Sequence, residues 1–216
     1  MPWIEQFEPA NWGEAGWIAL GAYFLGCFTT GYYLVRMWTD EDIRDSGSGN
    51  VGAKNVGRAL GKTGFFLTLL GDFGKGVFAI WAARHFTSDP RAVSLAAIAV
   101  VAGHIWPIQL FFRGGKGMAT SLGALLALDY HFAGAFLLFF AAGFAVLRKT
   151  VLPGLLAFAC LPALCLYLDS NPARSFGISV LAILIVFAHR KNLFEEIVLL
   201  LERRHLHHPH QHKKSL

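Results

Sequence analysis

The stretch DSGSGNVGAKNVGRALGK, residues Asp45–Lys62, lies between two long apolar segments and contains almost no large apolar side chain. Glycine lets a backbone turn sharply and approach a ligand closely, and successive N–H groups in such turns form a concavity that binds anions. Arg and Lys add positive charge, and Arg contacts a phosphate at two points. The stretch therefore predicts a phosphate-binding loop at a membrane surface. Its candidate binding residues are Ser48, Gly49, Asn50, Lys54, Asn55 and Arg58.

Two nucleotide-binding motifs resemble parts of this stretch, and neither has the right context. Gly47–Gly52 fits G-x-G-x-x-G, but a charged run, Asp40–Asp45, precedes it where a dinucleotide site needs a strand. Gly61–Thr63 matches the end of a P-loop, yet Val56 stands where that motif needs glycine. The remaining alternative is a flexible glycine-rich connector, which leaves the interleaved serine, asparagines and cations unexplained.

The composition indicates an integral membrane protein. Of the 216 residues, 55% are hydrophobic and 15% are charged, whereas a soluble domain has about 25% charged residues. The apolar runs are long and unbroken, which favours helices over a β-barrel with its short alternating segments. We therefore expect an all-α fold with one membrane domain over residues 1–204. A His- and Lys-rich tail over residues 205–216 is expected to be disordered.

Seven apolar segments predict about seven transmembrane helices in one bundle, although several are shorter than the roughly 20 residues of a straight crossing. With seven crossings, 15 Lys and Arg residues fall on one face and three on the other, while Lys75 lies inside a segment. The positive-inside rule then predicts an outward N-terminus, a cytoplasmic C-terminus and a cytoplasmic phosphate-binding loop. The segments are Trp17–Met37, Gly64–Ala83, Val93–Phe112, Met118–Leu128, Phe132–Leu147, Val151–Leu168 and Phe176–Ala188.

A second glycine-rich segment with cations follows the third apolar segment. Its residues are Arg113, Gly114, Gly115, Lys116 and Gly117, and the segment lies just before a predicted helix, whose N-terminus attracts anions. Two such segments on one face predict either two phosphate sites or one phosphate held from both sides. An ordinary positively charged turn is the alternative.

Three ionisable residues lie within apolar segments. His104 is a candidate substrate-binding residue, because an ionisable group at membrane depth is usually functional; a histidine satisfied by a backbone carbonyl is equally compatible. Asp72 and Lys75 are three residues apart on one helix face, and we expect them to pair and to orient the first loop.

The segment after the last apolar run contributes a further candidate pair. His189 and Asn192 are three residues apart and would share a face where the chain leaves the membrane. They are expected either to complete the site or to cap the final helix. An amphipathic surface helix is predicted over Leu193–Leu201.

Together these motifs closely resemble the bacterial acyl-phosphate-dependent glycerol-3-phosphate acyltransferases, the PlsY family. The resemblance rests on four motifs in the same order: SGNVGAKNVGR, GDFGKG, GHIWP with GGKGMAT, and HRKN, which begin at Ser48, Gly71, Gly103 and His189. It implies a seven-helix enzyme of the bacterial inner membrane with its active site at the cytoplasmic face. It also implies transfer of an acyl group from acyl phosphate to the 1-hydroxyl of glycerol 3-phosphate, which gives lysophosphatidic acid and phosphate.

The resemblance also implies roles for individual residues. Ser48, Arg58, Lys116, His189 and Asn192 are expected to be catalytic. The sequence departs from the family pattern at Lys54 and Arg113 and at a serine-containing motif, whose place is taken by Arg148–Gly154 with Thr150 as its one hydroxyl. A changed acceptor or a weakened enzyme are therefore alternatives, and Lys54 is a candidate to replace the lost anion contacts.

Direct acyl transfer is expected, because no Ser or Cys lies in a recognisable nucleophile–base arrangement. Either the departing phosphate or His189 is expected to take the hydroxyl proton. No cofactor, metal or nucleic acid is predicted, and the oligomeric state is not readable from the sequence. The competing functions are a transporter or channel for a phosphorylated metabolite, which needs a polar route through the bilayer, and a non-catalytic protein that binds acidic lipid.

Overall fold

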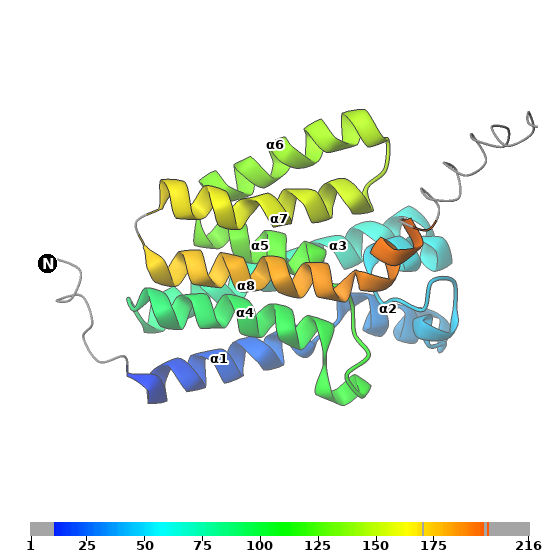
Figure 1. Cartoon of the computed structure of the whole chain (residues 1–216). Helices are drawn as coiled ribbons and strands as arrows, with labels where there is room; N and C mark the ends of the chain where they lie inside the picture. The colour runs from blue at the N-terminus through cyan, green and yellow to red at the C-terminus, as the bar shows by residue number, and fades with distance from the viewer. Residues whose placement is uncertain (1–10, 170, 197, 199–216) are drawn as a thin grey trace, which may run out of the picture.

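The computed structural model describes residues 11–169, 171–196 and 198, and all regular structure within these residues is helical (Figure 1). The strand required by a dinucleotide-binding motif is therefore missing from this part of the chain. The predicted tail, residues 205–216, lies outside the described residues, as do positions 197 and 199–201 of the predicted Leu193–Leu201 helix. The helices are α1 (Trp12–Cys27), α2 (Thr30–Thr39), η1 (Ile43–Asp45), α3 (Ala53–Phe86), α4 (Pro90–Ile105), η2 (Ile108–Leu110), α5 (Met118–Leu128), α6 (Tyr130–Leu147), α7 (Val151–Leu168) and α8 (Pro172–Ala188).

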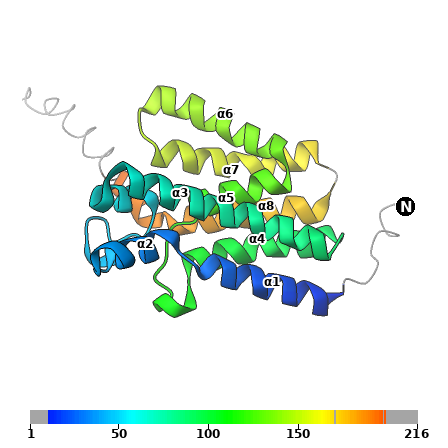
Figure 2. The same ribbon diagram turned by 180° about the vertical axis from the view of Figure 1, so that it is seen from behind.

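The helices run back and forth in a single bundle (Figures 1 and 2). Helix α4 packs against α1 and α8, α5 packs against α3, and α6 pairs with α7. Buried apolar side chains such as Leu125, Phe158 and Ile185 form the core. Large apolar side chains, including Trp17 and Leu166, are exposed on the outer faces, which is the surface that a lipid bilayer requires.

Glycines allow the central helices to approach each other closely. A methyl group at Gly26 would overlap the carbonyl of Val100, and one at Gly76 would overlap the carbonyl of Thr120. The first pair joins α1 to α4 and the second joins α3 to α5. Small residues at helix contacts are typical of membrane bundles, where association depends on close packing.

The length and apolarity of the helices confirm a helical membrane fold. Among the described residues, five segments are long and apolar enough to span a bilayer: α1 with α2, α3, α4 with η2, α6 and α7. Helix α8 makes a sixth if it is counted with the helical segment Arg190–Glu196, which bends away from it by 61°. Helix α5 is about 16 Å long, roughly half the thickness of the hydrocarbon core. Seven crossings and the orientation of the termini remain predictions.

The first apolar segment is broken into α1 and α2 at Phe28 and Thr29, a break that the sequence pattern did not indicate. The predicted pair of Asp72 and Lys75, on α3, satisfies the backbone groups that the break leaves free. Lys75 Nζ donates to the carbonyls of Gly26 (3.0 Å) and Phe28 (2.7 Å). Asp72 Oδ1 accepts from the N–H of Thr30 (3.3 Å) and lies 3.1 Å from Lys75 Nζ. The pairing expected for these residues is confirmed, and the ion pair holds the break.

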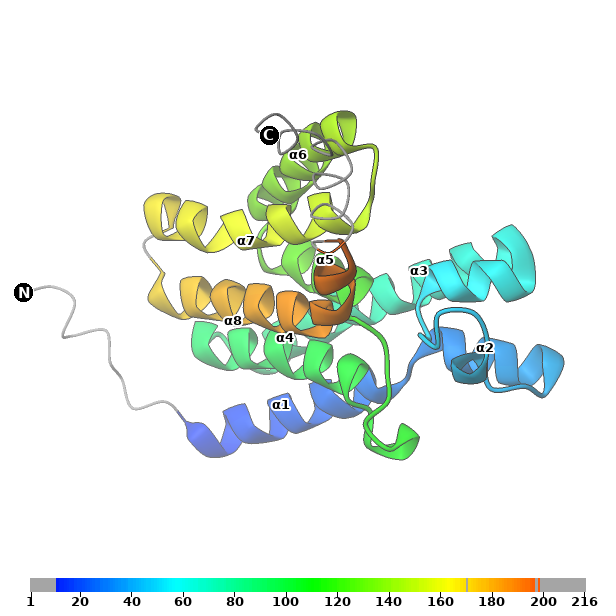
Figure 3. The same ribbon diagram turned by 45° about the vertical axis from the view of Figure 1, so that its right-hand side comes forward.

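Helix α3 begins at Ala53, inside the stretch expected to be a loop as far as Lys62. The expectation of a loop over Ala53–Lys62 was therefore wrong. Gly61 alone departs from helical geometry there, with φ +69°, and bends the helix. Helix α2 and the first turns of α3 project from the end of the bundle (Figure 3).

Candidate active site

A single buried amide organises the first glycine-rich loop, residues 46–52. Asn55 Nδ2 donates to the carbonyls of Ile43 (3.2 Å) and Ser46 (2.9 Å), and its Oδ1 accepts from the N–H of Ser48 (3.0 Å). Gly47 lies against this amide with φ +59°, a conformation that favours glycine. The Asn55 amide thus shapes the loop from behind, while Ser48 and Gly49 are exposed and Asn50 is half-buried.

The first turns of α3 carry three cations on one face. Lys54, Arg58 and Lys62 are spaced four residues apart, and together with Gly57, Gly61 and Phe65 they line an open groove of about 350 Å³. Like charges at this spacing destabilise a helix. A bound anion would relieve that repulsion.

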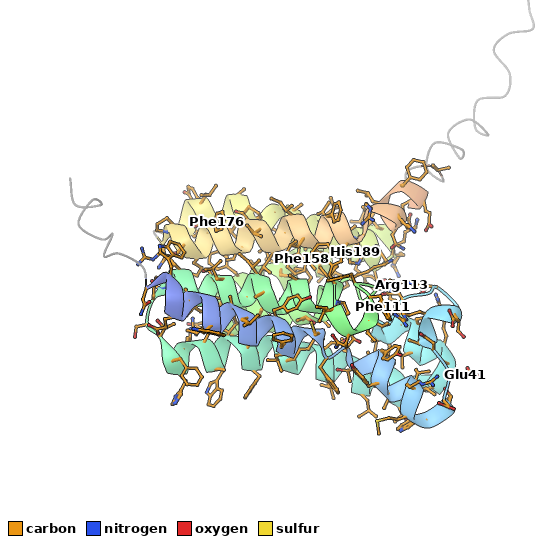
Figure 4. The ribbon with its side chains drawn as sticks, turned by 90° about the horizontal axis from the view of Figure 1, so that it is seen from below. Glu41, Phe111, Arg113, Phe158, Phe176 and His189 are labelled. Carbon is orange, nitrogen blue, oxygen red and sulfur yellow. The ribbon has the colours of Figure 1, made fainter. Side chains whose placement is uncertain are left out.

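The second glycine-rich segment runs back against the end of α4. The N–H of Gly114 donates to the carbonyl of Ile105 (3.1 Å), and that of Gly115 donates to the carbonyl of His104 (3.0 Å). Gly117 has φ +80° and precedes α5. Lys116 is half-buried and Arg113 is exposed. Figure 4 shows Arg113 near Phe111, at the end of the bundle where α8 reaches His189.

The predicted histidine at the end of α8 is buried with a defined tautomer. Its Nδ1 lies 2.8 Å from the carbonyl of Ile185, and since a carbonyl only accepts hydrogen bonds, Nδ1 carries the ring proton. Burial, together with the nearby cations of Lys116 and Lys54, lowers the pKa of His189 below its ordinary value. The imidazole is therefore neutral at pH 7, and its Nε2 has a free lone pair.

Side-chain contacts bring the motifs together at one end of the bundle, here called the cationic end and defined by Lys54, Arg58, Lys116, Lys149 and His189. Lys116 Nζ donates to Asn192 Oδ1, which joins the second loop to the segment after α8. Lys54 Nζ donates to Thr150 Oγ1, which joins α3 to the loop between α6 and α7. Lys149 pairs with Glu196. Four segments far apart in the sequence thus meet at one surface.

Some cations of the bundle are paired with carboxylates, including Lys149 at the cationic end, and others are not. At the end away from this surface, Arg91 pairs with Asp89, and Arg174 pairs with Asp129 and Asp169. At the cationic end, Lys54, Arg58 and Lys116 have no carboxylate within salt-bridge distance among the described residues. Burial and the neighbouring charge of Lys191 lower the pKa of Lys116, partly offset by Glu195. Excess positive charge in a partly buried site is suited to anionic ligands.

The helix N-termini at the two ends of the bundle differ in whether a side chain caps them. The side chains of Asn11, Asp89, Asp129 and Asn171 cap α1, α4, α6 and α8 at the end away from this surface. Helices α3, α5 and α7 begin at the cationic end, after Gly52, Gly117 and Thr150, and none of these residues makes a side-chain cap bond. Their first N–H groups are therefore left available to an anion, which a helix N-terminus also attracts through its dipole.

The candidates expected from the sequence thus fall into two groups. In the first group, Lys54, Lys116, His189 and Asn192 meet at the cationic end, and Arg58 lines the groove beside Lys54. Ser48, Gly49, Asn50 and Arg113 belong to this group as exposed or half-buried residues of the two glycine-rich loops. Asn55 and His104 are turned inward, each less than 4% exposed, and hold backbone or buried groups. Sequence reasoning gave Lys149 and Glu196 no part in the site, because charged residues at such loop ends are ordinarily solvated.

The fold defines a helical membrane protein with cations and uncapped helix N-termini gathered at one end of its bundle, an arrangement suited to anionic ligands. A family model described as "Glycerol-3-phosphate acyltransferase" matches residues 16–197. "Glycerol-3-phosphate acyltransferase 1" of Desulfitobacterium hafniense is 48% identical over 186 residues, covering 84% of this chain and 92% of the relative. The protein of the same name from Bacillus cereus is 37% identical, covering 80% of this chain and 94% of the relative. The chain belongs to the glycerol-3-phosphate acyltransferase family.

Two solved structures support the same assignment. Both are of PlsY (YgiH), described as an integral membrane glycerol 3-phosphate acyltransferase. The glycerol 3-phosphate form matches with a TM-score of 0.78 and 32% identity, and covers 85% of this chain and 92% of that one. The lysophosphatidic acid form matches with a TM-score of 0.76 and 31% identity over the same shares. The family resemblance drawn from the sequence motifs is confirmed.

Proposed function

We propose that this protein transfers a fatty acyl group from acyl phosphate to the 1-hydroxyl of glycerol 3-phosphate, at the cytoplasmic face of a bacterial inner membrane crossed seven times. Membership of the family makes the chain an acyltransferase that acts on glycerol 3-phosphate. The observation that supports the donor is the excess of charge and of free N–H groups at the cationic end. Three uncapped helix N-termini and at least three cations without a described carboxylate are more than one phosphate needs.

In the proposed reaction, Arg58 and Lys116 hold the two phosphates and offset their mutual repulsion. The hydroxyl oxygen of glycerol 3-phosphate attacks the carbonyl carbon of the acyl phosphate. The bond between that carbon and the phosphate oxygen then breaks, and inorganic phosphate leaves. Acyl phosphate is already activated, so positioning and neutralisation supply most of the catalysis. Ser48, Asn50 and Asn192 add hydrogen bonds to the substrates.

The hydroxyl proton passes to His189 in this proposal. The Nδ1–H bond to Ile185 leaves Nε2 as the acceptor, and burial together with the neighbouring cations keeps the ring neutral until it accepts a proton. The N–H groups of Lys116 and Gly117 stabilise the developing oxyanion, a contribution of about 3 kcal/mol per donor, whereas those of Gly114 and Gly115 stay bonded to Ile105 and His104.

The donor assignment is tested with purified protein and labelled glycerol 3-phosphate, supplied in parallel with acyl phosphate, acyl-CoA or an acyl thioester of acyl carrier protein. We expect labelled lysophosphatidic acid and one phosphate released per turnover with acyl phosphate alone. Faster product formation with acyl-CoA would overturn the assignment of acyl phosphate as the donor. Arg58→Ala should abolish transfer while the protein remains folded by size-exclusion chromatography.

A phosphorylated-metabolite transporter is the second candidate, and the same protein in vesicles discriminates it. Among the described residues, the acidic and basic side chains in the middle of the bundle are those of Asp72, Lys75 and His104, and all three are buried and bonded to one another or to backbone. Uptake of labelled glycerol 3-phosphate without acylation would favour transport over transfer.

A further inference from the structure

We infer that Lys75 and His104 act together as positioning residues that fix Gly115, and with it the ammonium group of Lys116, in the site. The inference rests on the proposed function only in placing Lys116 at a substrate phosphate. Neither residue reaches the surface, since Lys75 is 6% and His104 is 3% exposed. Their effect on the reaction must therefore pass through other groups.

Lys75 is a buried hub between three parts of the bundle. Its ammonium donates to the two carbonyls at the α1–α2 break and to Nδ1 of His104 on α4 (2.8 Å), and it forms an ion pair with Asp72 on its own helix (3.1 Å). Because the ammonium donates, Nδ1 of His104 accepts, and the ring proton of the neutral imidazole is on Nε2. Lys75 thus sets both the tautomer and the orientation of the His104 ring.

The His104 ring in turn lies directly against the second loop. A methyl group built at Gly115 would overlap Nε2 of His104, and its next nearest atoms are Cε1 and Cδ2 of the same ring. The carbonyl of His104 also accepts the N–H of Gly115 at 3.0 Å. Gly115 is therefore held by the ring on one side and by a backbone bond on the other.

Lys116 follows Gly115 directly and reaches Asn192. A displacement of Gly115 would move the Lys116 backbone away from this contact. Misplacing a binding group by about 1 Å can lower a rate about 100-fold. Position 115 therefore requires glycine, because any larger residue there would push against the His104 ring and displace Lys116.

The geometry allows a test by size complementation with a matched control. The three atoms nearest to a methyl group at Gly115 all belong to the His104 ring, whereas those nearest to one at Gly114 are the carbonyl oxygens of His104 and Ile105 and the ring of Pro107. Removing the imidazole makes room at position 115 and none at 114. The variants are Gly115→Ala, Gly114→Ala, His104→Ala and the two double variants, measured for kcat and KM with glycerol 3-phosphate.

We expect Gly115→Ala to lower kcat/KM about 100-fold, the scale of a 1 Å misplacement, mainly through KM. In the double variant, kcat/KM should return to within about threefold of His104→Ala, since coupled neighbours are non-additive. Gly114→Ala should gain nothing from His104→Ala. Equal rescue at both positions, or rescue at neither, would overturn the inference.

Two further measurements keep the test decisive. His104→Gln can still accept from Lys75, and we expect it to retain at least tenfold more kcat/KM than His104→Ala. This comparison decides the outcome if Gly115→Ala does not fold, and equal values for the two His104 variants would contradict the inference. The thermal stabilisation that glycerol 3-phosphate gives each variant in the absence of any acyl donor should rank the variants in the same order as kcat/KM. A failed donor proposal would therefore leave this ranking intact, whereas a failed positioning role would remove it.

Discussion

The substitution Asn55→Asp separates shaping of the first loop from contact with substrate. A carboxylate keeps the bond accepted from the Ser48 N–H, but it cannot donate to the carbonyls of Ile43 and Ser46. The bond to the Ile43 carbonyl is buried and that to the Ser46 carbonyl is partly buried. A buried carbonyl left without its donor costs about 1–3 kcal/mol, so the closed loop loses on the order of 2 kcal/mol. At 1.36 kcal/mol per factor of ten, kcat/KM should fall about 30-fold.

The assay is the initial rate of lysophosphatidic acid formation across glycerol 3-phosphate concentrations, with folding checked by size-exclusion chromatography and thermal unfolding. Asn171→Asp is the matched control, because the Asn171 amide oxygen accepts from the N–H groups of Ala173 and Arg174 at the start of α8. Aspartate caps a helix as well as asparagine, so activity should be unchanged. An Asn55→Asp protein with wild-type kcat/KM would refute the role given to this amide.

Three other predictions concern packing, pH and the α6–α7 loop. Gly76→Ala should destabilise the α3–α5 contact by about 1–3 kcal/mol through overlap with Thr120, whereas Gly74→Ala, with open space around it, should be neutral or stabilising in thermal unfolding; equal effects would contradict the packing. The lowered pKa of Lys116 means that its charge is lost below the pH of about 10.4 at which a solvated lysine titrates. As the pH is raised, the KM for glycerol 3-phosphate should therefore begin to increase at a lower pH in the wild type than in Lys116→Arg, and a wild-type KM that does not change with pH would argue against this. Thr150→Val removes the hydroxyl bonded to Lys54 and should raise KM about five- to tenfold at this exposed position, while Thr150→Ser should not; indistinguishable KM values would exclude a role for the hydroxyl.

Helix positions were predictable where apolar runs end abruptly. The bounds expected for Met118–Leu128 and Val151–Leu168 are those of α5 and α7. The start of α3 was missed, because glycine and asparagine disfavour helix in any local measure. In the fold, Asn55 closes the preceding loop, and the helix can begin at Ala53.

The break between α1 and α2 was hidden for the opposite reason. The break lies in a run of small residues, Thr29, Thr30 and Gly31, which are common inside membrane helices and so do not mark a helix end. The groups that stabilise the break come from elsewhere: Lys75 binds two of its carbonyls, and Gln109 Nε2 donates to the carbonyl of Cys27 (2.6 Å). Such long-range partners cannot be read from spacing.

The sequence indicated which residue types form the site, but it did not indicate which way their side chains point. Asn55 and His104 share motifs with surface residues, and only the folded chain shows that both point inward. The sequence also could not predict that the uncapped helix N-termini gather at one end of the bundle, because this depends on the tertiary arrangement of the helices. Lys54 and Thr150, both departures from the family pattern, are likewise brought together only by tertiary structure.

The central claim is that segments from four parts of the chain form one phosphate-binding surface at the cationic end. The most direct measurement is an experimental structure of this protein with glycerol 3-phosphate bound. We predict its phosphate within hydrogen-bonding distance of Arg58 or Lys116, and its 1-hydroxyl on the side of His189. A phosphate bound at the other end of the bundle, beside Arg84 and Arg174, would contradict the account.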